Sequence, residues 1–184
     1  MVRAVTLLPY SGTFQVTLDA KHRVILPAAL RKRAEEELAD SKYQGEFFLT
    51  RFRNDSLELY TAVGFLKVVE RMKRNVQRKR GKGHMDAKKL FKRFTTEAVR
   101  LSIGEQGRVL IPVKFVEAAG LEKNQPAVIV GAFDVIEIWS PDRHAAYYQP
   151  LEEDPELVEE LMTDLTRDPE EDADLDEMMD QLRS

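Results

Sequence analysis

Two arginines occupy matching positions of a repeated segment, and they are the residues of this chain best suited to binding an anion. Residues 18–27 (LDAKHRVILP) return as residues 103–112 (IGEQGRVLIP), with an apolar residue, a polar turn, an arginine, three apolar residues and a proline in the same order. Such a repeat indicates two copies of one supersecondary unit. The shared arginines are Arg23 and Arg108. A turn folds without arginine, whereas a planar guanidinium binds phosphates and base edges, so the repeat predicts two anion-binding positions.

The charge of the chain is divided between a basic body and an acidic tail. Residues 1–150 contain 26 Lys and Arg against 17 Asp and Glu, whereas residues 151–184 contain 2 against 15. The net charges of +9 and −13 sum to the −4 of the whole chain. This division predicts a polyanionic partner for the body, and a tail that either shields the body or binds a partner of its own.

Hydrophobic periodicity predicts the same series of elements in both copies. In the first copy we expect strands at 13–18 and 24–26 and a helix at 28–39. In the second we expect a helix at 113–119 and a hairpin of strands at 127–130 and 135–139. Each copy ends in an alternating strand closed by an aromatic residue, LELY at 57–60 and IEIW at 136–139. Between the copies, an apolar stripe predicts a linker helix; it consists of Phe65, Val69, Met72 and Val76.

The helix expected at 28–39 carries its cations before its acids, since residues 31–33 (RKR) precede residues 35–37 (EEE). This order opposes the helix dipole, at a cost of roughly 0.3–1 kcal/mol per exposed charge. Two interpretations remain open. Either cations such as Arg31 lie beside a ligand, or the helix is a surface helix with i,i+4 ion pairs, namely Arg31–Glu35, Lys32–Glu36 and Arg33–Glu37.

The linker is strongly basic after its apolar stripe. From Arg71 to Arg93 there are 11 Lys and Arg and a single acid, Asp86. We expect either direct contact with nucleic-acid phosphates or a solvated surface, and the sequence favours neither. The residues of the first interpretation are Arg78, Lys79, Arg80 and Lys82, beside the helix-breaking Gly81-Lys82-Gly83.

Taken together, these motifs closely resemble those of the MraZ family of bacterial transcription regulators, over residues 10–148. The resemblance implies two AbrB-like halves that form one swapped-hairpin β-barrel, assembled into closed rings on repeated short boxes in promoter DNA. The expected fold is therefore α+β, mainly β, with short crossover helices and a linker helix. Its expected parts are a first half at 10–62, a basic linker helix and loop at 63–97, a second half at 98–148 and an acidic tail at 149–184.

The family's Asp-x-x-x-Arg motif places Arg23 and Arg108 on the DNA-facing side, with Asp19 as the orienter of the first arginine. Lys21, His22 and Arg31 are the other expected DNA contacts; the alternative for Asp19 and Arg23 is a plain ion pair across the turn. The chain departs from the family at His22, which replaces a glycine, and at Gly104, which replaces the second aspartate. His tolerates positive φ, so we expect the first turn to survive. Without its aspartate, Arg108 has a less secure role than Arg23.

The expected function is a sequence-specific DNA-binding regulator that represses its own promoter and the division and cell-wall gene cluster. The alternative is an antitoxin-like interaction module whose acidic tail binds a protein. We expect no enzyme, cofactor or metal: there is no cysteine and no Gly-rich phosphate loop, and the three histidines lie far apart. No apolar run spans a bilayer and no signal peptide is evident, so we expect a cytoplasmic, nucleoid-associated protein without membrane contact.

The acidic tail is expected to be largely disordered, because it is rich in acid and poor in aromatic residues. Two leucine-rich patterns qualify this expectation. Leu157, Leu161 and Leu165 repeat every four residues, and a second set consists of Leu175, Met178, Met179 and Leu182. Such spacing is typical of short amphipathic helices that become ordered on a partner. Isolated helices of this length are marginal in water, which favours a plain solubilising tail.

Overall fold

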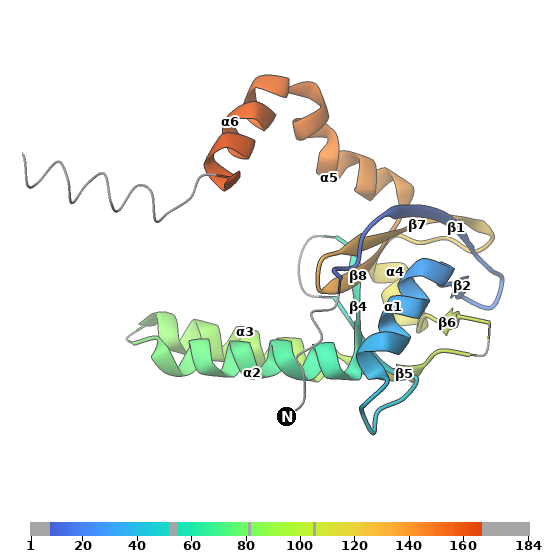
Figure 1. Ribbon diagram of the computed structural model, residues 1–184, viewed down its shortest axis with the longest axis horizontal. Helices are drawn as coiled ribbons and strands as arrows, with labels where there is room; N and C mark the ends of the chain where they lie inside the picture. The colour runs from blue at the N-terminus through green and yellow to red at the C-terminus, as the bar shows by residue number, and fades with distance from the viewer. Residues whose placement is uncertain (1–7, 52–54, 81, 105, 167–184) are drawn as a thin grey trace, which may run out of the picture. The chain divides into compact units, whose positions relative to one another are not determined.

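The computed structural model describes residues 8–51, 55–80, 82–104 and 106–166, which fall into two units, residues 1–144 and 145–184. The first unit is built on a six-stranded antiparallel sheet with the order β1-β7-β8-β4-β3-β5 (Figure 1). The strands of this sheet are β1 (Thr13–Leu18), β3 (Glu46–Thr50), β4 (Leu57–Thr61), β5 (Val99–Ser102), β7 (Gln125–Ala132) and β8 (Val135–Trp139). A second sheet consists of two short strands, β2 (Arg23–Ile25) and β6 (Arg108–Leu110).

The two copies of the repeat intermix strand by strand. Strand β1 of the first copy pairs with β7 of the second, β4 pairs with β8, and β2 pairs with β6. Because these pairings join residues that are far apart in the chain, neither copy forms its sheet alone. The α+β class expected from the sequence is therefore confirmed, with both copies contributing to one core.

Helices α1 (Ala28–Leu38) and α4 (Val113–Ala118) are the crossover helices of the two copies. Each begins directly after a proline, Pro27 or Pro112, whose fixed φ suits a helix start. Helix α1 buries Leu30, Ala34 and Leu38, the stripe that the spacing of four predicts. These side chains belong to one cluster with the buried residues of both sheets, so α1 is held by tertiary packing.

Two helices, not one, fill the linker. Helix α2 (Ala62–Arg78) begins at Thr61, whose Oγ1 accepts the N–H of Gly64 at 2.9 Å, and α3 (Lys82–Glu97) returns alongside it. We expected a linker helix followed by a loop, and α3 forms in place of that loop. Phe94 of α3 is fully buried, and its ring stacks on Phe65 of α2 with centroids 5.4 Å apart. This contact docks the hairpin on the sheet, where Phe65 also stacks on Phe48.

The remaining described residues form α5 (Pro141–Glu153) and α6 (Pro155–Thr166). Residues 149–153 and 155–166 are therefore helical, where the composition predicts a largely disordered tail. Helix α6 follows the leucine spacing noted above, and Asp154 Oδ1 accepts the N–H of Leu157 at 3.0 Å, as a helix cap does. The second leucine-rich pattern lies outside the described residues. Within the described ranges, no helix combines the length and apolar character needed to cross a membrane.

Candidate nucleic-acid interface

The two repeated turns adopt the same backbone geometry. In the first, the N–H of His22 donates to the carbonyl of Asp19 at 2.9 Å; in the second, the N–H of Gly107 donates to the carbonyl of Gly104 at 2.8 Å. The bonds that close the turns match as well, with Asp19 N–H to the Arg23 carbonyl at 2.9 Å and its counterpart from Gly104 to Arg108 at 3.0 Å. The sequence repeat is thus a repeat in structure.

Each turn is also bonded to the other copy. The carbonyl of His22 accepts the N–H of Ile111 at 2.9 Å, and the carbonyl of Gly107 accepts the N–H of Leu26 at 2.8 Å. Both carbonyls belong to residues with positive φ, 60° at His22 and 76° at Gly107. The prediction that His22 tolerates this backbone is confirmed, and the departure from glycine leaves the turn intact.

Strands β2 and β6 form a two-stranded ribbon with one buried and one outward face. The register pairs Arg23 with Leu110, Val24 with Val109 and Ile25 with Arg108. Both valines are fully buried, whereas Ile25 is 54% and Leu110 58% exposed and Arg108 is exposed. Because side chains alternate along a strand, the four outward residues share one face. The two arginines occupy one diagonal of this ribbon face, and the two apolar residues occupy the other.

Arg23 is held in place by Asp19. Asp19 Oδ2 accepts a hydrogen bond from Arg23 Nε at 2.7 Å and forms an ion pair with Arg23 Nη2, also at 2.7 Å. Asp19 Oδ1 accepts the backbone N–H groups of Lys21 at 2.8 Å and Arg23 at 2.9 Å. These bonds, above all those from the Arg23 side chain, lower the pKa of Asp19 from 3.8 to about 2. The carboxylate is therefore charged at neutral pH. It engages one edge of the guanidinium, which leaves the Nη1 side for another acceptor.

Arg108 stands in the matching position without a matching carboxylate. Gly104 occupies the place of Asp19, and no ion pair joins Arg108 to a described residue. A Cβ atom at Gly104 would lie 3.7 Å from the Arg108 Cβ, which is ordinary van der Waals contact. We call the turn at Asp19–Arg23 the first corner of the ribbon face and the turn at Gly104–Arg108 the second corner. The second corner therefore has room for a carboxylate but lacks one.

Of the other predicted contacts, Lys21 is exposed on the first turn and His22 is half-buried beside it. Arg31 reaches the second turn from α1, because its Nη1 lies 2.7 Å from where a Cβ of Gly107 would be. The structure thus brings Lys21, His22 and Arg31 to the two ends of the ribbon.

The ion pairs expected along α1 form in part, one at the surface and one inside the fold. Arg31 Nε lies 3.8 Å from Glu35 Oε1, as the ion-pair interpretation expects. The Arg33–Glu37 pair, also 3.8 Å apart, is not on the surface: the two side chains are 15% and 9% exposed. Glu37 Oε2 accepts hydrogen bonds from the hydroxyls of Tyr10 at 3.1 Å and Thr61 at 2.9 Å. Of the three predicted surface pairs, one is therefore part of a buried network that ties α1 to the sheet, and Lys32 and Glu36, both described, form no ion pair with each other.

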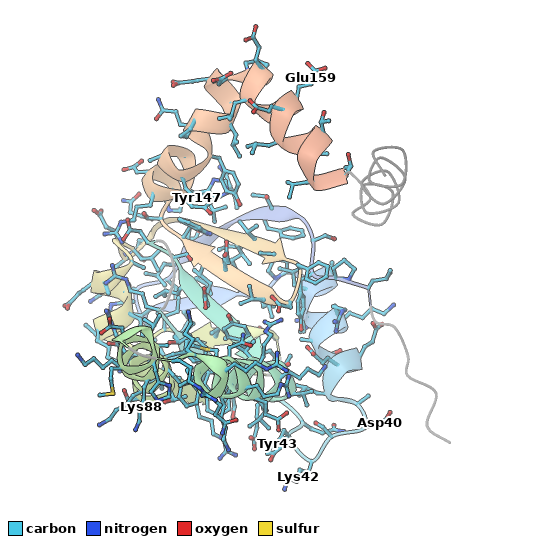
Figure 2. The ribbon with its side chains drawn as sticks, turned by 90° about the vertical axis from the view of Figure 1, so that its left-hand side faces the viewer. Asp40, Lys42, Tyr43, Lys88, Tyr147 and Glu159 are labelled. Carbon is cyan, nitrogen blue, oxygen red and sulfur yellow. The ribbon has the colours of Figure 1, made fainter. Side chains whose placement is uncertain are left out.

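The basic residues predicted at 78–82 lie elsewhere. Arg78, Lys79 and Arg80 are exposed at the turn between α2 and α3, and Lys82 begins α3. Figure 1 places this turn on the opposite side of the first unit from β2 and β6. In Figure 2, which looks along the hairpin, nitrogen-bearing side chains surround both helices, Lys88 among them. The hairpin is thus a second basic surface, separate from the ribbon face.

Sequence reasoning missed Ile25 and Leu110. Ile25 belongs to the apolar run 24–26, which we expected to be a strand, and Leu110 belongs to the matching run 109–111 of the repeat. In the structure only the middle residue of β2 and of β6 is buried. The signal was the arginine before each run: if Arg23 and Arg108 face solvent, the residue two positions later faces solvent too. Alternation therefore extends the outward face from two residues to four.

Comparison with known proteins gives a consistent result. The profile of a family described as "MraZ protein, putative antitoxin-like" matches residues 10–83 and 94–165, more than half of the chain. Curated proteins named "Transcriptional regulator MraZ" are similar: that of Ligilactobacillus salivarius is 32% identical over 155 residues, covering 84% of this chain and 97% of the relative. That of Symbiobacterium thermophilum is 33% identical over 152 residues, covering 82% and 95%.

A solved structure, PHS018 from Pyrococcus horikoshii, covers 70% of this chain and 87% of its own at 17% identity, with a TM-score of 0.28. A similarity this low carries no argument about the fold. The family assignment rests on the profile match, which includes both repeated turns, and on relatives matched over nearly their whole length. The chain belongs to the MraZ family.

Proposed function

We propose that the ribbon face binds double-stranded promoter DNA and that the protein regulates transcription by doing so. The observation that carries the proposal is the fixed guanidinium of Arg23, held by Asp19 through two 2.7 Å contacts on the outward face of the ribbon. The major groove admits a two-stranded ribbon, and an oriented arginine binds guanine there through two hydrogen bonds. Lys21, His22 and Arg31 then lie where the flanking phosphates pass.

The two arginines have different tasks in this proposal. Arg23 has lost part of its rotational freedom before binding, so it reads bases at a fixed angle. Arg108 has no carboxylate at Gly104 to orient it, so it contacts the backbone or reads bases less strictly. The plain alternative, an ion pair across the first turn, is a part of this arrangement, because the pair sets the direction of Arg23.

The finer expectations of the family resemblance belong to the same proposal. They are a swapped-hairpin barrel closed by the intermixed halves, a ring of subunits on repeated boxes, and repression of the protein's own promoter and of the division and cell-wall gene cluster. The relatives' name, transcriptional regulator, supports the regulatory role. Ring assembly would raise a weak single-site affinity, because neighbouring boxes meet neighbouring subunits at high effective concentration. Such a protein works in the cytoplasm at the nucleoid.

The basic hairpin contributes sequence-independent attraction in this proposal. Its tip lies across the first unit from the ribbon face, at the end of a 17-residue helix about 25 Å long. One subunit therefore reaches separate stretches of DNA with its two basic surfaces. Contacts of this kind strengthen binding to any duplex and weaken with salt.

The test is a binding titration on the promoter upstream of this protein's own gene, against scrambled DNA of equal length, at two salt concentrations. We expect a preference for the promoter that survives the higher salt. Arg23→Ala and Arg23→Lys should both lose the preference, because lysine keeps the charge but not the bidentate geometry. Lys42→Ala removes an exposed charge outside the ribbon and is the matched control. A preference retained by Arg23→Lys would show that charge alone acts at this position.

A protein partner for the tail is the second candidate function, and one observation favours it. Helix α6 exposes apolar side chains on an acidic helix, with Leu161 41%, Met162 53% and Leu165 79% exposed. Such a face suits an antitoxin-like role, in which the tail binds a basic, apolar groove of another protein. Affinity capture with the purified protein, with and without residues 151–184, distinguishes this role from one in DNA binding.

A further inference from the structure

We propose that Ile25 and Leu110 read thymine, each by apolar contact with the 5-methyl group of a base in the major groove. This inference rests on the proposed DNA-binding function and names the base chemistry that the ribbon face recognises. It assigns a role to the two outward side chains of the ribbon that are not arginines.

Both side chains are exposed although they are large and apolar. Ile25 is 54% and Leu110 58% exposed, although each lies next to a fully buried valine on its own strand. An outward isoleucine and an outward leucine at equivalent places of a repeat therefore point to a contact with something outside the subunit.

The surroundings of the two residues favour DNA over another protein surface. Ile25 is paired with Arg108 and Leu110 with Arg23, so each apolar side chain has a guanidinium beside it. Asp19 is the one acid among the described residues of 18–27 and 103–112, and it is already bonded to Arg23. A second copy seated here would bring like charges together in an apolar contact, which is unfavourable. A duplex supplies the negative charge instead.

The major groove offers one large apolar group, the 5-methyl of thymine. It lies at the base edge, at the depth where a guanidinium reaches guanine. The ribbon has arginines on one diagonal and aliphatic side chains on the other. It therefore fits a DNA sequence in which guanine and thymine alternate between the two DNA strands. The inference predicts that the boxes contain thymines at fixed positions relative to the guanines.

The test replaces thymine by uracil, which lacks only the methyl group, one position at a time in the promoter fragment. For the full-length wild type we expect a loss of about fourfold in affinity at each contacted position, the effect of burying about one methyl-sized group. Ile25→Ala should bind the thymine probe more weakly and lose the uracil effect at one position. Leu110→Ala should do the same at another. Leu66→Ala, which shortens an exposed leucine of α2, should keep every uracil effect.

The outcomes separate this inference from the function on which it rests. If the wild type binds promoter and scrambled DNA alike, the proposed function fails and thymine reading fails with it. If the promoter preference stands but uracil changes nothing at any position, only the thymine inference is overturned. It is also overturned if the uracil effects persist in both alanine variants. A change of assembly size in Ile25→Ala, seen by light scattering, together with persistent uracil effects would assign Ile25 to a protein interface.

Discussion

Placing an aspartate at Gly104 should give the second corner of the ribbon face the geometry of the first. The turn bonds of the two corners agree within 0.1 Å, at 2.9 and 2.8 Å across the turn and 2.9 and 3.0 Å at its closure. A Cβ at Gly104 meets its nearest atoms at 3.7 Å, and Gly104 does not have positive φ. The carboxylate of Gly104→Asp can therefore reach Arg108 as Asp19 reaches Arg23.

Two effects follow, and they differ in size. Replacing a glycine in a backbone that other residues tolerate stabilises a protein by about 0.4–1 kcal/mol, and an exposed ion pair adds between about 0 and 1 kcal/mol. For DNA, an oriented bidentate arginine contributes about 1–3 kcal/mol of discrimination between bases. The ratio of promoter affinity to scrambled-DNA affinity should thus rise at least about fivefold. Total affinity for scrambled DNA should fall, since the new carboxylate repels phosphate.

The assay is the two-salt titration described above, on wild type, Gly104→Asp and Gly104→Asn. Asparagine fills the same space and has the same effect on the unfolded chain, but it brings no charge to hold the guanidinium. A urea melt of each variant checks that the ribbon stays folded. We expect the affinity ratio to rise for aspartate alone. The salt slope should fall by about 0.9 if Arg108 leaves one phosphate contact for a base.

Two results would refute this reasoning. If aspartate and asparagine change the affinity ratio equally, orientation of Arg108 by charge has no part in recognition. If Gly104→Asp stabilises the fold as expected but leaves both the ratio and the salt slope at wild-type values, Arg108 does not touch DNA. The carry-over of the second motif would then be wrong, while the role of Arg23 would stand.

Four further predictions follow from single features. Phe94→Ala should lower the free energy of unfolding in urea by about 3–5 kcal/mol because it empties a buried stacked position, whereas Leu90→Ala on the exposed side of α3 should stay within about 0.5 kcal/mol. Arg23→Ala should return the pKa of Asp19 from about 2 toward 3.8, as measured by carboxyl NMR. Because the pKa in the folded protein is the lower value, the wild-type ion pair is intact above pH 3.8 and is lost only as the pH falls through about 2. Promoter binding by the wild type should therefore show no step from this pair near neutral pH. Neutralising residues 78–80 should reduce the salt slope by about 0.9 per lost phosphate contact and leave the promoter preference in place. Deleting residues 151–184, which hold 15 acids, should raise affinity for random DNA more than for the promoter; equal affinity for random DNA before and after the deletion would contradict a shielding tail.

Much of the first unit could be predicted because its signals are local. The repeated segment predicts the turn at Asp19, and the stripe of Leu30, Ala34 and Leu38 predicts the face that α1 buries. The long-range strand pairings have no such local signal. The pairing of β2 with β6 joins residues about 85 positions apart in the repeat, and no periodicity within either strand indicates its partner.

The helix α3 and the outward side of the ribbon were missed for a different reason. Glycines at 81 and 83 indicated a break. Helix α2 does end at Arg78, but Gly83 already belongs to α3. A break between two helices looks the same in sequence as the start of a loop. The spacing of Ala87, Phe91 and Phe94 was the available sign of a second helix. In the ribbon, strands of three residues are too short to distinguish a fully buried run from an alternating one.

The intermixing of the two copies explains why the candidate site can be asymmetric. Each corner of the ribbon face combines residues of both copies, since Arg23 lies opposite Leu110 and Ile25 opposite Arg108. If two identical chains supplied the strands, the two corners would be identical, and a change at one would appear at both. With both copies in one chain, His22 can differ from Gly107, and Asp19 from Gly104, while the shared backbone bonds of the turns persist. A ribbon of this kind can read an asymmetric box in one orientation, so reversing a single box within a promoter array should weaken binding of the wild type. For Gly104→Asp, whose corners are more alike, the same reversal should cost less.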